Sequence, residues 1–182
     1  MTKSNMNILE ALDFAARRHS AQKRKGEAEE PYLNHVIEVA HLLAQATQGS
    51  DPNLLIAGIL HDTVEDTETT SAEIEGLFGT DIATLVAEVT DDKSLAKQER
   101  KRLQIEKTPH KSDRAKMIKL ADKTSNLKAI AASPPADWSD ERKRDYLEWA
   151  RAVAAGCRGV NAELEAGFDA SYDGGIRMLH RD

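Results

Sequence analysis

The chain has 182 residues, of which 40% are hydrophobic, 31% charged and only 4% aromatic, and its formal net charge is −6. This length suits one compact domain, and the scarcity of aromatic residues favours helices over a β-sandwich. The negative charge disfavours a general nucleic-acid binder. The single cysteine, Cys157, excludes an intramolecular disulfide and fits a reducing compartment, and we expect it to be a small buried hydrophobic residue.

Neither the N-terminal segment nor the longest apolar stretch is typical of a membrane or secreted protein. Residues 1–20 contain no apolar core of the kind that a signal peptide needs. The longest apolar stretch, residues 54–60, has seven residues, whereas a membrane-spanning helix needs ~20. We therefore expect a cytoplasmic protein with no membrane partner.

Helical periodicity dominates the first third of the chain. Two helices are predicted over residues 7–22 and 31–48. Asp51 and Pro52 form a strong helix start, because aspartate caps a helix and proline fits its first position. The helix that follows is expected to continue to about Asp66. It is apolar nearly all round, which predicts that it is the buried central helix.

The rest of the chain continues the helical pattern. Further helices are predicted over residues 70–79, 82–89, 97–106 and 114–131. Thr70 and Glu73 fit a capping box. The last predicted helix begins at a cap on Ser139 and stays in register to Gly167, and the tail over residues 168–182 shows no clear pattern. No convincing strand pair is present, so we predict a single all-α domain over residues 1–182.

Residues 61–66, of sequence HDTVED, place one histidine and three carboxylates at the end of the most apolar helix. Residues three and four apart share a helix face, so His61 is expected to lie over Glu65, and Asp62 beside Glu65 and Asp66. Carboxylates this close repel one another and call for a counter-cation. A divalent metal would serve, with His61 as a nitrogen ligand. A solvated acidic helix end is the alternative that this segment alone leaves open.

Two further residues could complete a metal site. His35 lies one turn into the helix that begins at Pro31, and Asp122 lies mid-helix with small or apolar neighbours at i−4, i+3 and i+7. A buried carboxylate is costly unless it is paired or bound to metal. The alternatives are a hydrogen-bonded core histidine and a surface pair of Asp122 with Asn126 or Lys119. Two imidazoles and two carboxylates suit manganese or iron, with water in the remaining positions.

Several motifs agree in order and spacing with one known family. The order of His35, His61, Asp62 and Asp122 is the ligand order of the HD-domain phosphohydrolases. The chain resembles the hydrolase half of RelA/SpoT proteins in five segments, at residues 24–25, 31–35, 60–67, 89–93 and 119–127. It is most similar to the small alarmone hydrolases, which include the metazoan SpoT homologue. The resemblance covers residues 11–165.

This resemblance implies a helical HD-domain bundle that binds one Mn²⁺ per chain and removes the 3′-pyrophosphate of (p)ppGpp, giving GDP or GTP. The implied metal ligands are His35, His61, Asp62 and Asp122. Glu65 and Asp66 would position and deprotonate the attacking water. The implied substrate contacts are Arg24, Lys25, Lys97, Asn126, Arg142 and Tyr146. Guanidinium and ammonium groups are what a polyanionic nucleotide needs.

Two features depart from the family pattern. Val36 stands where a proline often follows the first ligand, and the loop at residues 26–30 is unusually acidic for the expected nucleobase site. The base preference therefore stays open, and the alternatives are the same site acting on (pp)pApp or as an NADPH 2′-phosphatase.

Two other function classes are weaker. A non-catalytic nucleotide sensor conflicts with the intact set of ligands. A helical nucleic-acid-binding module drawing on residues 97–102 fits poorly with the net charge. The sequence does not predict the oligomeric state.

Overall fold

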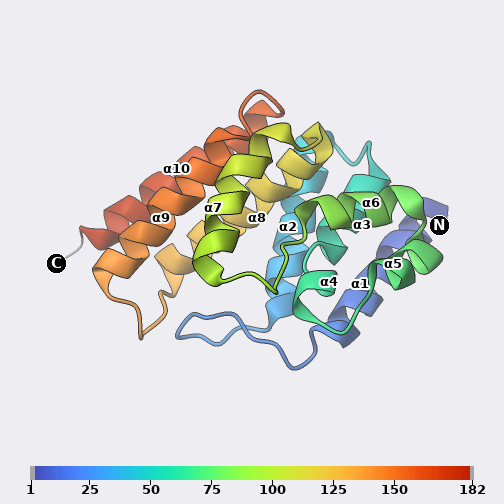
Figure 1. Ribbon diagram of the computed structural model, residues 1–182, viewed down its shortest axis with the longest axis horizontal. Coiled ribbons are helices and arrows are strands. Elements are labelled where there is room, and N and C mark those ends of the chain that lie inside the picture. The colour runs from blue at the N-terminus through green and yellow to red at the C-terminus, as the bar shows by residue number, and fades with distance from the viewer. Residues whose placement is uncertain (1–2, 181–182) are drawn as a thin grey trace.

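The computed structural model describes residues 3–180, which form a bundle of helices (Figure 1). In chain order these are α1 (Lys3–Arg18), α2 (Tyr32–Thr47), α3 (Pro52–Leu60), α4 (Thr63–Asp66), α5 (Ser71–Phe78), α6 (Thr80–Val89), α7 (Lys97–Lys107), the 3₁₀ turn η1 (Thr108–His110), α8 (Asp113–Ala132), α9 (Asp140–Ala155) and α10 (Ala162–Leu179). Extended pairing within residues 3–180 is limited to an isolated bridge between Lys23 and Pro31. The all-α prediction is confirmed.

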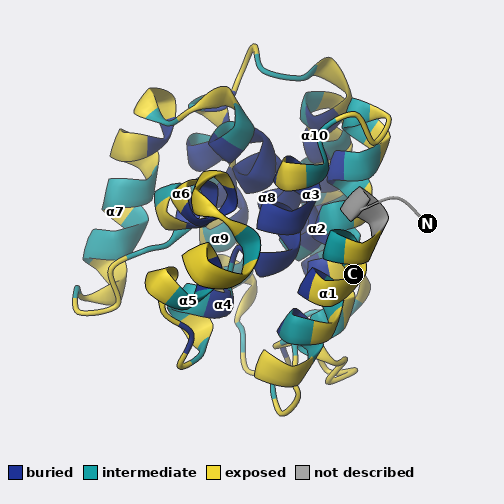
Figure 2. Cartoon of the chain, turned by 90° about the vertical axis from the view of Figure 1, so that its right-hand side faces the viewer, coloured by how far each residue is buried: buried dark blue, intermediate teal, exposed yellow. Residues whose placement is uncertain are grey.

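Two helices form the centre of the bundle. Every residue of α3 from Leu54 to Leu60 is buried, as predicted, and Asp51 caps the helix by accepting a hydrogen bond of 3.0 Å from the Leu54 amide. The second central helix, α8, is also largely buried and packs against α2, α3, α6, α9 and α10 (Figure 2). α9 and α10 lie at one end of the molecule and α1 and α5 at the other (Figure 1). No helix that the structure describes has both the length and the apolar character to cross a bilayer.

The structure corrects the helix predicted to run through Asp66. α3 ends at Leu60, and the single turn α4 starts at Thr63, so His61 and Asp62 lie between two helices. Side chains cap the C-terminal end of α3: the Thr63 hydroxyl donates to the Leu60 carbonyl at 2.7 Å, and His61 Nδ1 lies 2.8 Å from the Gly58 carbonyl. These bonds satisfy carbonyls that a helix end leaves without partners. The apolar run does stop at Leu60, but the polar residues after it are also compatible with a continuing helix, so the sequence did not predict the interruption.

The C-terminal prediction was also wrong in part. Ser139 does cap a helix, but α9 ends at Ala155, and α10 continues through most of the segment for which no pattern was found. Asn161 begins α10 by accepting a hydrogen bond of 3.0 Å from the Leu164 amide, a cap that we did not recognise. Phe168 is fully buried, so α10 belongs to the core. Residues 181–182 lie outside the described residues. Cys157 is buried, as expected, and burial raises the pKa of its thiol to about 11.

A long loop between α1 and α2 is fastened to the end of α8. The two sides of the loop are joined by a hydrogen bond of 2.8 Å from the Arg24 amide to the Glu30 carbonyl. The Ala28 amide donates to Ser133 Oγ at 3.0 Å. Gly26 packs so tightly that a Cβ there would lie 2.5 Å from the Ser133 carbonyl oxygen, which no other residue could accept without a shift. The loop therefore holds Arg24 and its neighbours beside α8.

Candidate active site

The predicted metal ligands come together in the middle of the bundle. His35 projects from α2, His61 and Asp62 lie between α3 and α4, and Asp122 lies midway along α8. His61 Nε2 lies 2.8 Å from Asp62 Oδ2. His35 Nε2 lies 3.6 Å from the same oxygen and 3.5 Å from Asp122 Oδ1. The candidate ligand atoms of His35, His61 and Asp62 all lie within 4.8 Å of one another, a spacing that could hold one metal ion.

Each of the two imidazoles presents its Nε2 to the cluster. Both Nε2 atoms are buried and neither makes a hydrogen bond of good geometry to a described residue, although His61 Nε2 lies 2.8 Å from Asp62 Oδ2. The opposite nitrogen is engaged in both rings, since His61 Nδ1 meets the Gly58 carbonyl and His35 Nδ1 lies 2.9 Å from Ser125 Oγ. A ring that donates from Nδ1 keeps an Nε2 lone pair for a metal. The donor set therefore fits a divalent cation.

The electrostatics of the cluster also suit a cation. Burial lowers the pKa of His35, so this ring is neutral. Burial acts in the same direction on His61, but the Asp62 carboxylate outweighs it and raises the pKa of His61 to about 9. Although burial would raise the pKa of Asp62, the two histidines hold it well below its usual range. The raised pKa of His61 and the lowered pKa of Asp62 correspond to an ion pair, which a bound metal would replace.

Both aspartates are oriented by donors. Lys123 Nζ lies 2.9 Å from Asp122 Oδ2, and Asn126 Nδ2 donates to Asp122 Oδ1 at 2.6 Å. The Tyr32 hydroxyl donates to Asp62 Oδ2. Burial and the nearby carboxylates raise the pKa of Tyr32 far above its usual value, so the hydroxyl remains a donor. The carboxylates are therefore fixed in direction before any ion binds.

The two predicted catalytic acids lie on α4, immediately after Asp62, in different surroundings. Glu65 Oε2 accepts a hydrogen bond of 3.0 Å from the Asp91 amide, and burial raises the pKa of Glu65. Asp66 accepts a hydrogen bond of 3.2 Å from Gln22 and forms an ion pair with Lys93. A carboxyl whose pKa is raised toward neutrality is suited to proton transfer, and one held by two donors is suited to orienting a neighbour.

A cavity of about 450 Å³ adjoins the cluster. Its lining includes all the predicted substrate contacts, namely Arg24, Lys25, Lys97, Asn126, Arg142 and Tyr146. Tyr32 and Asp66 also line it, which joins the cavity to the metal cluster. The volume falls within the ~300–1,000 Å³ common for small-molecule sites.

The α9 side of the cavity is an aromatic wall that carries cations. The ring of Tyr146 lies 5.6 Å from that of Trp138 and 5.3 Å from that of Trp149. Arg142 lies 4.6 Å over Trp138, and Lys123 Nζ lies 4.5 Å over Trp149. Such a wall offers ring faces to a flat base and positive charge to phosphates. Sequence reasoning missed both tryptophans and Lys123, because single aromatic and basic residues on a helix resemble ordinary core and surface positions.

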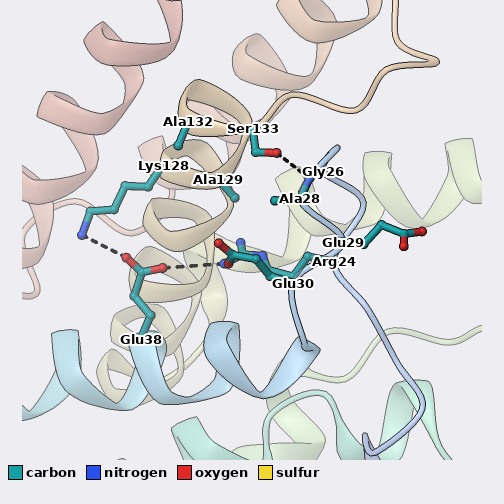
Figure 3. A pocket seen from close by; sticks show the side chains of 10 residues that line it. All are labelled: Arg24, Gly26, Ala28, Glu29, Glu30, Glu38, Lys128, Ala129, Ala132 and Ser133. Atoms are coloured by element: carbon teal, nitrogen blue, oxygen red, sulfur yellow. Dashed lines mark hydrogen bonds and ion pairs between the residues drawn. The ribbon is translucent and has the colours of Figure 1, made fainter.

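The acidic loop lines a different and smaller cavity, of about 190 Å³ (Figure 3). Glu29 and Glu30 belong to this small cavity and not to the lining of the large one, whereas Arg24 and Gly26 line both. Glu38, on α2, faces the small cavity between Arg24 and Lys128 (Figure 3). Glu29 and Glu30 therefore line the cavity next to the proposed substrate cavity. Their influence on the nucleobase site stays a prediction.

Comparison with known proteins agrees with this geometry. A family model described as the HD domain matches residues 11–148. The guanosine-3′,5′-bis(diphosphate) 3′-pyrophosphohydrolase MESH1 of Xenopus tropicalis is 49% identical over 172 residues, covering 94% of this chain and 96% of the relative. MESH1 of Homo sapiens is 51% identical over 158 residues, covering 87% and 88% of the two chains.

A solved structure of a metazoan SpoT orthologue, described as hydrolysing ppGpp, matches with a TM-score of 0.88 and 47% identity, over 92% of this chain and 94% of the other. Fold, sequence and donor set point in the same direction, to a metal-dependent hydrolase. The chain belongs to the HD-domain family and, within it, to the small alarmone hydrolases of the metazoan SpoT type.

Proposed function

We propose that this enzyme uses Mn²⁺ to hydrolyse (p)ppGpp at the ribose 3′-oxygen, releasing pyrophosphate and GDP or GTP. The observation that carries the proposal is the convergence of the buried Nε2 atoms of His35 and His61 with two oriented aspartates, at the edge of a cavity lined by cations. The relatives that are named as 3′-pyrophosphohydrolases support the same substrate. A cytoplasmic setting stays a prediction.

In this proposal His35, His61, Asp62 and Asp122 hold the metal. The bound ion would polarise the phosphoryl oxygens and lower the pKa of a water molecule. Glu65 accepts the proton of the attacking water, for which its raised pKa suits it, and Asp66 orients that water. The water oxygen bonds to the phosphorus of the 3′-pyrophosphate as the bond from that phosphorus to the ribose 3′-oxygen breaks. The 3′-oxygen leaves with the electron pair of the broken bond and takes up the proton that Glu65 accepted.

The cavity residues hold the substrate. Arg24, Lys25 and Asn126 would contact the nucleoside end, and Lys97 and Arg142 the phosphates. Tyr146 lies in the aromatic wall, where a ring can stack against a base. Positioning by several weak contacts aligns the 3′-pyrophosphate with the metal cluster.

The test is a phosphate-release assay on metal-stripped protein, with and without added Mn²⁺. Pyrophosphate release is measured from ppGpp, pppGpp and pppApp, and orthophosphate release from NADPH. Asp62→Asn is the diagnostic variant, and Asp13→Asn, an exposed position on α1, is the matched control. We expect Mn²⁺-dependent turnover of the guanine nucleotides, lost in Asp62→Asn and kept in Asp13→Asn.

Other outcomes would change the proposal in defined ways. Turnover of pppApp or NADPH alone would keep the catalytic site and refute the substrate. Tight nucleotide binding without any turnover would refute the enzyme and leave a sensor.

A further inference from the structure

Behind the metal cluster, a side-chain network joins a metal ligand to a glutamate that the proposed reaction does not use. Glu38 lies on α2, one turn after His35. Its Oε2 accepts a hydrogen bond of 2.6 Å from the Ser125 hydroxyl of α8, and that same hydroxyl oxygen lies 2.9 Å from His35 Nδ1. Ser125 is fully buried and the Glu38 side chain is about 29% exposed. One hydroxyl thus stands between a carboxylate and an imidazole.

The proton count of this hydroxyl decides the direction of each bond. A serine hydroxyl has one proton and two lone pairs. The carboxylate, which lies 3.2 Å from Lys128 Nζ and 3.7 Å from Arg24 Nη1, accepts that single proton. Ser125 Oγ can therefore only accept from the histidine. Its other lone pair faces Arg24 Nη1, which donates at 3.4 Å.

The consequence falls on His35. Because the neutral ring must donate from Nδ1, its Nε2 carries the lone pair, and this is the buried atom that lacks a partner in the cluster. Ser125 without Glu38 could rotate and donate to Nδ1, and the ring proton would then move to Nε2. That tautomer cannot bind a metal until the proton leaves.

We propose that Glu38 is a positioning residue for the metal centre, which acts through the Ser125 hydroxyl to hold His35 in its metal-binding tautomer. The inference rests on the metal site proposed above and adds a residue to it. Figure 3 shows Glu38 between Arg24 and Lys128, with an ion pair to each. Through Ser125, Glu38 thus links the small cavity that it lines to His35 of the metal cluster.

The experiment compares the binding of Mn²⁺ to full-length protein without any nucleotide, by titration calorimetry. Glu38→Met removes the acceptor and keeps the length of the side chain. Glu38→Gln retains an amide oxygen that can accept the hydroxyl proton. Lys128→Met is the matched control, because it removes another partner of Glu38 and leaves Ser125 untouched.

We expect Glu38→Met to weaken Mn²⁺ binding by roughly 10-fold, the size of effect known for partners behind metal ligands. Glu38→Gln restores most of the affinity, and Lys128→Met binds as the unchanged protein does. Ser125→Ala weakens binding as much as Glu38→Met, and the double variant is no weaker than Ser125→Ala alone, because the two residues act in series.

A second readout tests the tautomer itself. Two-bond nitrogen–proton NMR spectra of the metal-stripped protein distinguish a ring protonated on Nδ1 from one protonated on Nε2. We expect the Nδ1–H form of His35 in the unchanged protein and a gain of the Nε2–H form in Glu38→Met. A purely structural role would not move this signal, and thermal melting confirms that each variant is folded.

The outcomes separate the two proposals. If the unchanged protein fails to bind Mn²⁺, the proposed function is wrong. If it binds Mn²⁺ and Glu38→Met binds equally tightly with His35 still in the Nδ1–H form, the role of Glu38 is refuted. Additive losses in the double variant would likewise refute the path through Ser125.

Discussion

The metal cluster and the aromatic wall of the large cavity differ in how firmly their polar groups are held. In the cluster, short side chains are buried between α2, α3 and α8, and most of their polar atoms are fixed by a protein partner. In the wall, Arg142 is a long side chain at the surface that lies over the ring of Trp138 and pairs with Asp137. The cluster is set before substrate arrives, whereas the wall can adjust to it. Substitutions should therefore affect catalysis in the cluster and binding in the wall.

The largest effect is expected from removing a ligand. His61→Ala takes away the imidazole that lies 2.8 Å from Asp62 Oδ2 and removes one of the donors proposed to hold the ion. A metal contributes several kcal/mol of transition-state stabilisation, and a loss of about 5 kcal/mol corresponds to roughly 10⁴-fold in rate. Mn²⁺ affinity and kcat should fall together. His41→Ala, at a position on α2 outside the cluster, serves as the control, and an active His61→Ala protein would disprove the assignment.

A smaller loss is expected from Glu65→Gln. The amide keeps the size of the side chain but cannot take a proton from water, so kcat should fall by about 10²–10³-fold. Mn²⁺ affinity should stay close to that of the unchanged protein, because Glu65 is not among the proposed ligands. Loss of metal binding in this variant would instead move Glu65 into the coordination set. Calorimetry and single-turnover rates together make the distinction.

The protonation of His61 predicts how metal binding depends on pH. Since its pKa is raised to about 9, the metal must displace a proton below that pH, and affinity should rise by about tenfold per unit between pH 7 and 8. A raised pKa also stabilises the metal-free fold below the unfolded value of 6.5, and that contribution is lost as pH rises through 9. The metal-free melting temperature should therefore decline across this window. Proton release measured in two buffers of different ionisation enthalpy checks the first part.

Substitutions in the aromatic wall should change KM more than kcat. Arg142→Met removes a cation that lines the cavity and keeps the stem of the side chain, so KM should rise by about 10-fold with kcat nearly unchanged. Arg151→Met, on the same helix and paired with Glu148, is the control. A fall in kcat without a change in KM would show that Arg142 acts on the transition state, and the contrast between cluster and wall would then fail.

The same contrast explains what could be predicted from the sequence. The proposed ligands could be selected from the sequence because the HDTVED segment is dense in carboxylates, because helical periodicity turns Asp122 inward, and because their order resembles that of the HD-domain family. The interruption after Leu60 could not be predicted, because the polar residues that follow the apolar run are also compatible with a continuing helix. The side-chain hydrogen bonds that end α3 are visible only in the structure. Ser125 and Glu38 are 87 positions apart, so only the packing of α2 on α8 brings them together. The role proposed for the tryptophans of the wall could not be predicted, because it depends on the cavity that they line.

The fastening of the long loop to the end of α8 has an evolutionary consequence. Lys25 reaches the cavity from a segment whose tip is attached through Gly26 and Ser133, just past the last turn of α8, whereas Asp122 lies midway along that helix. Changes at Lys25 can therefore alter the lining of the cavity while the proposed metal cluster stays intact, whereas Arg24 is tied to that cluster through Ser125 and Glu38. A lineage could exchange one phosphorylated substrate for another through this segment, provided that Arg24 and the tightly packed Gly26 are kept.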